Sequence, residues 1–243
     1  MKYTIVCPIY NEIDYIENCI QSFINQTVFQ DIEVILVDGM STDGTVAIID
    51  QYCEKYPNIR KIENPRRITP VSMNLGIKNA TTDYILTLGA HTIYPNNYVE
   101  VLAEKIIELN ADLVGGGLKS LPASNSILCK SIATLMSSPF GIGFSFRNGC
   151  NEIKKVNTIS FGLYRKELFE KLGYFDEELA RGQDDELNAR INQNGGLIYF
   201  IPGIEVRYYT RNSIIKFIKM FFTFGFYKPL INSKLKRPNS LRQ

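Results

Sequence analysis

Two short stretches of this sequence bring together side chains that can do chemistry. The single histidine, His91, lies in "LGAHTIYP", directly after an apolar run at 84–88 that is typical of a buried strand. An imidazole at the end of such a strand can bind a metal, move a proton or cap a turn. Late in the chain, "GQDDELNARI" places Asp184, Asp185 and Glu186 in a row at the start of a helical pattern. A carboxylate there can take a proton from a hydroxyl group.

The elements that must position these side chains alternate along the first half of the chain. Strand-like runs lie at 3–9, 32–38, 59–64 and 84–88, and helical patterns follow them at 13–23, 44–56, 70–78 and 98–109. This alternation predicts βαβ units and an α/β fold with a central, mainly parallel sheet that has helices on both faces. Because the carboxyl ends of parallel strands share one edge, the motifs that follow the strands are expected to meet there.

The pattern changes in the second half. A further strand is predicted at 111–118, and the Ser-, Gly- and Phe-rich region 122–151 is interpreted as a mobile loop or a substrate-facing insertion. Strands are then expected at 155–165, 197–202 and 204–210, with a helix at 184–193 between them. The run 213–230 predicts a last helix that is apolar over most of its surface.

Several classes of protein are excluded by what the sequence lacks. No G-x-G-x-x-G follows the first strand and no Walker P-loop occurs, so a nucleotide must be bound by other means. A net charge of +2 does not indicate a nucleic-acid partner. The five cysteines are scattered without C-x-x-C spacing, which favours reduced thiols over disulfides or zinc. The first residues are too polar for a signal peptide, and no apolar run is long enough to cross a bilayer.

Four motifs in a fixed order point to one family. "CPIYNE", "VDGMSTDGT", "LGAHTIYP" and "GQDDELNARI" make essentially the whole chain resemble the inverting family 2 glycosyltransferases of the GT-A fold. "NPRRITPVSMNLGIKNA" and "RNSIIKFIKMFFTFGFYK" are similar to the branch of succinoglycan-type exopolysaccharide glucosyltransferases. The resemblance implies a GT-A domain at 1–212 and an amphipathic helix with a basic tail at 213–243. It further implies transfer of a sugar, with inversion, from a nucleotide-diphosphate donor, expected to be a UDP-sugar, to a glycan or lipid-linked acceptor.

The resemblance assigns the donor site to the strand ends. Tyr10 can stack on a uracil, whereas Asn11 can contact the nucleotide, cap the next helix, or do both. Asp38 can accept a hydrogen bond from the ribose or the base, although Gly39 follows where many relatives have a second acid. Either Arg66 or Arg67 can approach the diphosphate. The expected donor-binding residues are Pro8, Tyr10, Asn11, Glu12, Asp38, Arg67, Asn74, Gly89 and Ala90.

The metal motif departs from the family pattern. Relatives carry Asp-x-Asp or Asp-Ala-His, and this chain reads Gly89-Ala90-His91, so His91 keeps a metal-ligand position while the first carboxylate is absent. The expected cofactor is a divalent metal, Mn²⁺ or Mg²⁺, of which Mn²⁺ accepts imidazole more readily. Tyr208 stands where relatives often have a second histidine. A structural role for His91 remains the alternative, and a nucleotide-sugar-binding protein with little or no catalysis is the corresponding alternative function.

For the reaction itself, the resemblance nominates Asp184 as the general base, with Asp185 as the second candidate. Glu186 and Arg190 are spaced for an i,i+4 ion pair, and acids at a helix start are also favoured by the helix dipole. The acceptor is expected near 157–161 and the Ser/Gly/Phe region. A sugar-1-phosphate nucleotidyltransferase shares such a sheet, but its glycine-rich, lysine-bearing first loop is absent.

The C-terminal region suggests a membrane surface as a further partner. No Asp or Glu occurs after Glu205, while Lys and Arg continue to the end of the chain. A basic, aromatic-rich helix suits the interface of an anionic membrane, which predicts a cytoplasmic location at the inner face of the cell membrane. The alternative is that this helix packs on the sheet and the tail is solvated.

Overall fold

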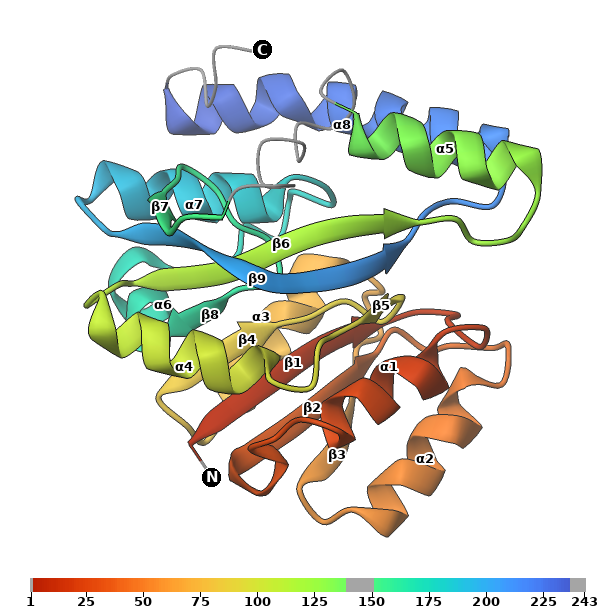
Figure 1. The fold of residues 1–243 in the computed structure, drawn as a ribbon, viewed down its shortest axis with the longest axis horizontal. Coiled ribbons are helices and arrows are strands. Elements are labelled where there is room, and N and C mark those ends of the chain that lie inside the picture. The colour runs from red at the N-terminus through yellow and green to blue at the C-terminus, as the bar shows by residue number, and fades with distance from the viewer. Residues whose placement is uncertain (1, 139–150, 237–243) are drawn as a thin grey trace.

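Four parallel strands form the first part of a nine-stranded sheet in the computed structural model, which describes residues 2–138 and 151–236 (Figure 1). They are β1 (Tyr3–Ile9), β2 (Ile32–Asp38), β3 (Ile59–Glu63) and β4 (Tyr84–Thr87). The sheet has the order β3-β2-β1-β4-β8-β6-β9-β5, and β7 pairs with β9. The predicted α/β fold with a mainly parallel sheet is confirmed.

The second half of the chain completes the sheet with strands of both directions. These are β5 (Thr92–Ile93), β6 (Leu113–Leu121), β7 (Lys154–Lys155), β8 (Leu163–Arg165) and β9 (Ile198–Tyr209). β8 lies antiparallel between β4 and β6, whereas β6 and β9 run parallel. β5 pairs antiparallel with β9, which brings the segment after β4 against the end of β9.

Helices cover both faces of the sheet, as predicted. They are α1 (Ile16–Ile24), α2 (Thr45–Lys55), α3 (Thr69–Asn79), α4 (Tyr98–Glu108), α5 (Ile127–Ser137), α6 (Glu167–Leu172), α7 (Gln183–Gln193) and α8 (Ile214–Leu235). Every residue of β2 is buried because alternate side chains face opposite layers. Val34 and Leu36 pack in the core with α1, α2 and α4, while Ile35 and Val37 pack in the core with α3, α6 and α7.

Three segments differ from the expectations. Residues 127–137 form a helix inside the region interpreted as a loop, and Ser126 caps it by accepting from the Cys129 amide at 3.2 Å; residues 139–150 lie outside the described part. The single strand expected at 155–165 is replaced by the short β7 and β8. The two strands expected at 197–202 and 204–210 are one strand, β9, in which Gly203 has a φ of 81°.

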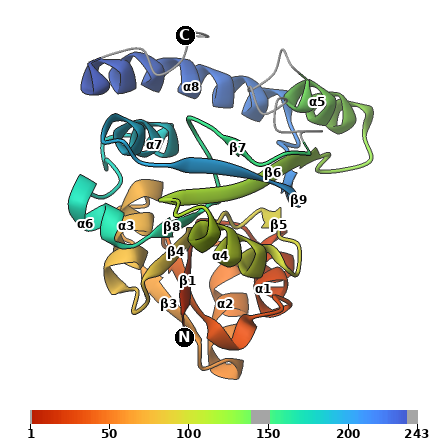
Figure 2. The ribbon, with the colours of Figure 1, turned by 60° about the vertical axis from the view of Figure 1, so that its left-hand side comes forward.

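The last helix lies over α7 and beside α5, in a layer at one end of the molecule in both views (Figures 1 and 2). Its second half packs in a small core of Leu179, Ala189, Ile231 and Leu235, and its first half meets α5 through Met220. The predicted helix at 213–230 is therefore confirmed and extends to Leu235. Among the described residues, no helix is both long and apolar enough to cross a membrane.

Candidate functional site

The loops after β1 and β2 are joined to each other by side-chain hydrogen bonds. The Asn11 side chain accepts from the Thr42 amide at 2.8 Å, and the Asn11 amide donates to Ser41 Oγ at 2.9 Å. Asn11 has a φ of 53°, and the cap position of α1 is occupied by Tyr15. The alternative in which Asn11 caps the following helix is therefore wrong: its side chain fixes the loop that follows Asp38.

Asp38 lies at the end of β2 and is only 2% exposed. Its carboxylate accepts from the Ser41 amide at 3.0 Å and from Ser41 Oγ at 2.6 Å. These bonds hold the acid in one orientation at the carboxyl edge of the sheet, where its contact with a donor stays a prediction.

A second set of bonds fixes the backbone of Glu12. The Glu12 amide donates to Thr45 Oγ1 at 3.0 Å, and the Ile13 amide donates to Asp43 Oδ2 at 3.1 Å. Asp43 Oδ1 accepts from the Thr45 amide at 3.0 Å, so the first turn of α2 supplies the support. These hydrogen bonds anchor the loop after β1 to the start of α2.

Tyr10 and Arg67 form an open aromatic and cationic corner next to these loops. Tyr10 directly follows β1, which ends with Pro8 and Ile9, and the residue is 47% exposed. The Arg67 guanidinium carbon lies 5.9 Å from the centre of the Tyr10 ring, within the range of a cation–π contact. An exposed ring beside a guanidinium suits a nucleobase and its phosphates.

Asn74, an expected contact of the sugar donor, and Arg66, the alternative to Arg67, both have partners within the protein. The Asn74 amide group donates to the Phe175 carbonyl at 2.9 Å and accepts from the Phe175 amide at 3.0 Å. Arg66 forms an ion pair with Glu177. Asn74 is buried, and both its side-chain nitrogen and its side-chain oxygen are hydrogen-bonded to Phe175. Its contacts are therefore those of a structural residue that fixes the segment before α7.

His91 lies between Glu12 and the end of β9. Its Nδ1 is 3.1 Å from Glu12 Oε1, and its ring lies edge-on to the Tyr208 ring with centroids 5.0 Å apart. Its carbonyl accepts from the Tyr209 amide at 3.3 Å. When Nδ1 carries the proton and donates to Glu12, Nε2 keeps the lone pair that a metal or a donor group would use. Tyr208, at the position where relatives are expected often to have a histidine, thus packs on the ring of His91.

Gly89 and Ala90 shape the turn in front of His91. The Gly89 amide donates to the Tyr94 hydroxyl at 2.8 Å, and Ala90 is buried. A Cβ atom placed on Gly89 would lie 3.1 Å from Cε1 of Phe161. The ring of Phe161 therefore occupies part of the space next to the position where the family pattern has its first acid.

The described residues offer a metal few ligands of their own. None of their His, Cys, Asp and Glu side chains form a group of three that could hold an ion. His91 and Glu12 are the adjacent pair at the expected position. Because Glu12 lies at Nδ1, Nε2 of His91 would be the one ligand from this pair, and a metal there would take its remaining ligands from diphosphate oxygens and water.

The start of α7 presents the two candidate bases in different environments. Asp184 Oδ1 is buried and has no hydrogen-bond partner among the described residues. Burial, and next the charge of Asp185, raise the pKa of Asp184 from 3.8 to about 7. Asp185, by contrast, accepts from Thr158 Oγ1 at 3.0 Å and lies 3.7 Å from Lys228 Nζ. A carboxylate that titrates near neutral pH is suited to take a proton, which distinguishes Asp184 from its neighbour.

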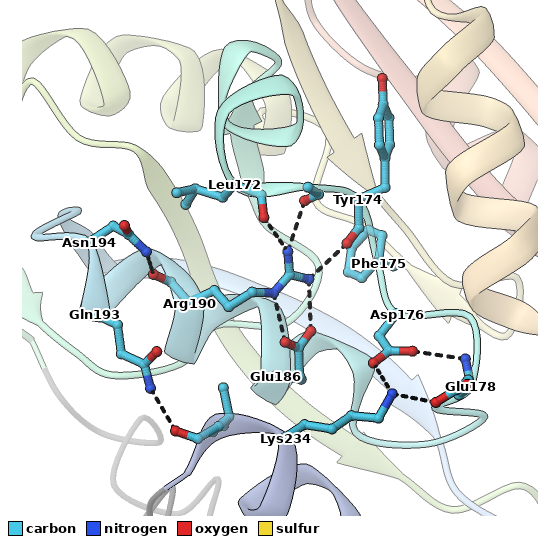
Figure 3. Close-up of polar contacts among 12 residues, drawn as sticks. Leu172, Tyr174, Phe175, Asp176, Glu178, Glu186, Arg190, Gln193, Asn194 and Lys234 are labelled. Atoms are coloured by element: carbon cyan, nitrogen blue, oxygen red, sulfur yellow. Dashed lines mark hydrogen bonds and ion pairs between the residues drawn. The ribbon is translucent and has the colours of Figure 1, made fainter.

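The third acid of the row has a structural role. Glu186 and Arg190 form a bidentate pair with both N–O distances at 2.7 Å, which confirms the expected i,i+4 pair (Figure 3). Arg190 also donates to the carbonyls of Leu172 and Tyr174 at 2.7 and 2.8 Å. The pair therefore ties α7 to the segment that follows α6.

Two arginines lie near this site for which the sequence motifs predicted no role. Arg181 precedes the cap residue of α7, and Arg211 follows β9 just beyond the tyrosines that contact His91. Arg181 is exposed at one side, and partial desolvation by the surrounding protein, and next the charge of Arg211, lower its pKa. Neither has a carboxylate partner among the described residues, and the remaining segments contain no Asp or Glu. Their signal was visible in "ARGQDD" and "YYTRN", yet only the fold brings the two charges together.

Comparisons with known proteins agree with this geometry. Residues 4–173 match the profile of the family described as Glycosyl transferase family 2. The chain is 32% identical over 240 residues to a dolichyl N-acetyl-alpha-D-glucosaminyl phosphate 3-beta-D-2,3-diacetamido-2,3-dideoxy-beta-D-glucuronosyltransferase of Methanococcus voltae, covering 95% of this chain and 74% of that protein. It is 28% identical over 223 residues to the succinoglycan biosynthesis protein ExoA of Rhizobium meliloti, covering 91% and 67%.

Solved structures show the same fold. The structure of TarS residues 1–349 of S. aureus in complex with UDP-GlcNAc superposes with a TM-score of 0.67 at 19% identity, covering 88% of this chain and 60% of that one. The complex of the same fragment with UDP gives a TM-score of 0.63 at 18% identity, covering 86% and 61%. This chain therefore spans about three fifths of the solved fragment.

Proposed function

Because this chain belongs to glycosyl transferase family 2, and so is a glycosyltransferase of GT-A fold acting in glycan synthesis, we propose that it inverts the anomeric centre of a UDP-sugar. The acceptor is proposed to be a hydroxyl of a glycan or of a lipid-linked glycan. The observation that carries this proposal is Asp184, a carboxylate with a buried oxygen and a pKa of about 7 at the start of α7. The TarS fragment has been solved with UDP and with UDP-GlcNAc, which supports UDP as the nucleotide here.

The donor is proposed to lie across the ends of β1, β2 and β4. The exposed Tyr10 ring stacks on the base, and Asp38, held by Ser41, accepts from the nucleoside. Arg67 next to that ring binds the diphosphate, and Arg181 and Arg211 add two further positive charges that lack carboxylate partners in the described part. These cations stabilise the negative charge that develops on the departing UDP.

A divalent metal is proposed to sit at His91, through Nε2, with Glu12 orienting the ring. When bound, such an ion, Mn²⁺ or Mg²⁺, would neutralise charge on the diphosphate oxygens. His91 itself is held by the contacts to Glu12 and Tyr208, which restrict the orientation of its ring.

The proton transfer is assigned to Asp184. Its carboxylate removes the proton of the acceptor hydroxyl while the hydroxyl oxygen forms a bond to the anomeric carbon from the side opposite the diphosphate. The bond from that carbon to the diphosphate oxygen breaks in the same step, which inverts the configuration and releases UDP. A base with a pKa near the working pH is both ionised and basic enough for this task.

The experiment is a release assay for UDP on a panel of UDP-sugars with lipid-linked and soluble glycan acceptors. Asp184→Asn is expected to lower turnover by about 10²–10⁴-fold while UDP affinity changes by less than about twofold. Asp83→Asn, at an exposed acid before β4, is the matched control and is expected to keep full activity. Wild-type turnover in Asp184→Asn would contradict the assignment, and UDP binding with no turnover on any donor would favour a binding protein.

We also propose that the exposed apolar face of α8, defined by Ile215, Ile218, Phe222 and Phe226, binds an anionic membrane. Ile215, Phe222 and Phe226 are 75%, 74% and 67% exposed. Lys216 and Lys219 lie among them on α8, and no acid occurs in that helix. Apolar side chains that enter the acyl boundary next to lysines that meet anionic headgroups would place the enzyme at the inner face of the cell membrane.

The membrane proposal is tested by co-sedimentation with vesicles of anionic and of neutral lipid. Phe222→Ser with Phe226→Ser should abolish salt-sensitive binding to anionic vesicles, whereas the inner residues of α8 are left intact. Binding that persists in this variant, or that is equal for neutral vesicles, would contradict it.

A further inference from the structure

The inner face of α8 packs on the segment that carries Asp184. Tyr227, Ile231 and Leu235 of α8 contact Leu179, which lies in the loop before α7, and Ala189, on α7 itself. The family match ends at residue 173, so both partners lie outside the matched region. A small hydrophobic core thus crosses the boundary expected at residue 212 and joins the last helix to α7, the helix that carries the candidate base.

The same helix also packs against Gly182, the cap residue of α7 and two positions before Asp184. Gly182 has a φ of 77°, in the left-handed region that favours glycine. A Cβ atom there would lie 2.4 Å from Cδ1 of Ile231, so a side chain at position 182 would require Ile231 to move. A displacement of α8 would therefore change the packing around the turn that orients Asp184.

Charged contacts hold α8 in the same place. Lys228 Nζ lies 3.7 Å from Asp185 Oδ2, with the two side chains 34% and 36% exposed. One turn and a half further along, Lys234 bridges Asp176 and Glu178, both at 2.5 Å (Figure 3). Thr158 binds the other oxygen of Asp185 at 3.0 Å, so this carboxylate is held from two sides.

We propose that α8 is a positioning element of the active site, in which Lys228 holds and neutralises Asp185 while Ile231 seats the Gly182 turn, so that Asp184 is the acid free to act as base. The inference rests on the proposed role of Asp184. Lys228 does not touch the reacting atoms: it acts through Asp185.

The physical reason is repulsion between neighbouring carboxylates. Asp185 disfavours the ionised form of Asp184, and a lysine beside Asp185 offsets part of that charge. Among the described residues, Tyr164 of β8 also interacts with Asp184, and it is neutral at physiological pH because burial, and next Asp184, raise its pKa. Removal of the Lys228 charge should therefore make Asp184 harder to ionise.

The test compares Lys228→Met with Lys228→Arg, which restores the charge, and with Lys171→Met, which removes an exposed lysine of α6. The carboxyl carbons of ¹³C-labelled aspartates are followed by NMR through a pH titration, with Asp184→Asn to assign the signal. We expect Lys228→Met to move the Asp184 midpoint upward by about half a pH unit, since a partly exposed charge acts through an effective dielectric near 20 or above. On the acidic side of the pH profile, the UDP-release rate should fall at a pH that is higher by the same amount. Turnover at pH 6 should therefore be about threefold lower.

Lys228→Arg should restore the midpoint, and Lys171→Met should leave it unchanged. An Asp184 midpoint in Lys228→Met that equals the wild-type value refutes the positioning role, since a purely structural contact would change stability without moving this titration. If Lys228→Met does not fold, Lys228→Gln supplies the same comparison with a polar side chain. Wild-type turnover in Asp184→Asn would instead refute the base, and with it the proposed function, whatever the NMR result.

Discussion

Asp184 should make the protein less stable as the pH rises, and its replacement by asparagine should remove this cost. In the unfolded chain this carboxyl ionises at its ordinary pKa of 3.8, whereas burial and Asp185 hold the folded pKa at about 7. Between these values the folded protein keeps a proton that the unfolded chain has lost. The free energy of unfolding therefore falls as the pH rises from about 4 to about 7.

The size of the effect follows from the difference between the two pKa values. A difference of about 3 pH units corresponds to about 4 kcal/mol of lost stability once the pH exceeds 7. About half of the loss is already present at pH 5.5, so about 2 kcal/mol remains to be lost between pH 5.5 and 8.5. Asparagine has nearly the same shape and cannot ionise, so Asp184→Asn should gain that much relative to wild type over this interval.

Urea unfolding at pH 5.5, 7 and 8.5, followed by far-ultraviolet circular dichroism, measures this gain directly. Asp83→Asn, at an exposed acid, is the control and should show no gain that grows with pH. A gain for Asp184→Asn that is the same at all three pH values would mean that Asp184 ionises in the folded protein as it does in the unfolded chain. A variant that is both more stable at high pH and inactive would show that the site trades stability for function.

Three further outcomes are expected. His91→Ala should lose about tenfold of the UDP affinity gained with Mn²⁺, measured by calorimetry with Mn²⁺ and with EDTA; an equal gain in both proteins would leave His91 a structural residue. Gly89→Asp should tighten Mn²⁺ only when Phe161→Leu makes room, because the new Cβ lies 3.1 Å from that ring; tightening by Gly89→Asp alone would show that the ring yields. Arg211→Gln should weaken UDP about five- to tenfold and leave uridine unchanged, whereas equal losses for both ligands would place Arg211 away from the diphosphate.

Much of the fold was readable from local patterns. The alternation of strands and helices in residues 3–109 predicted the parallel strands β1 to β4 and the helices between them, because burial on both faces demands apolar strands and an apolar helix stripe. The patterns were weakest where neighbours decide the structure. Residues 155–165 have strand-like composition, yet only two short strands form there, and 127–137 form a helix after a Ser- and Pro-rich start.

The chemical types of the site residues were also determined by the sequence alone. His91 after β4 and the acids at the start of α7 are where the motifs placed them, since a turn at a strand end or a helix start is a local event. The family followed from the order of four motifs and was shown by the match over residues 4–173. The roles of the donor residues stay predictions.

Only the tertiary structure decided what each of these residues is next to. It set His91 against Glu12, 79 positions away, and joined Asn74 to Phe175, 101 positions away. It also placed two adjacent acids in different environments: burial raises the pKa of Asp184, while Asp185 is held by Thr158 and Lys228. Desolvation and charge pairing depend on distances in space, which residues far apart in the chain acquire only when the sheet and its covering helices assemble.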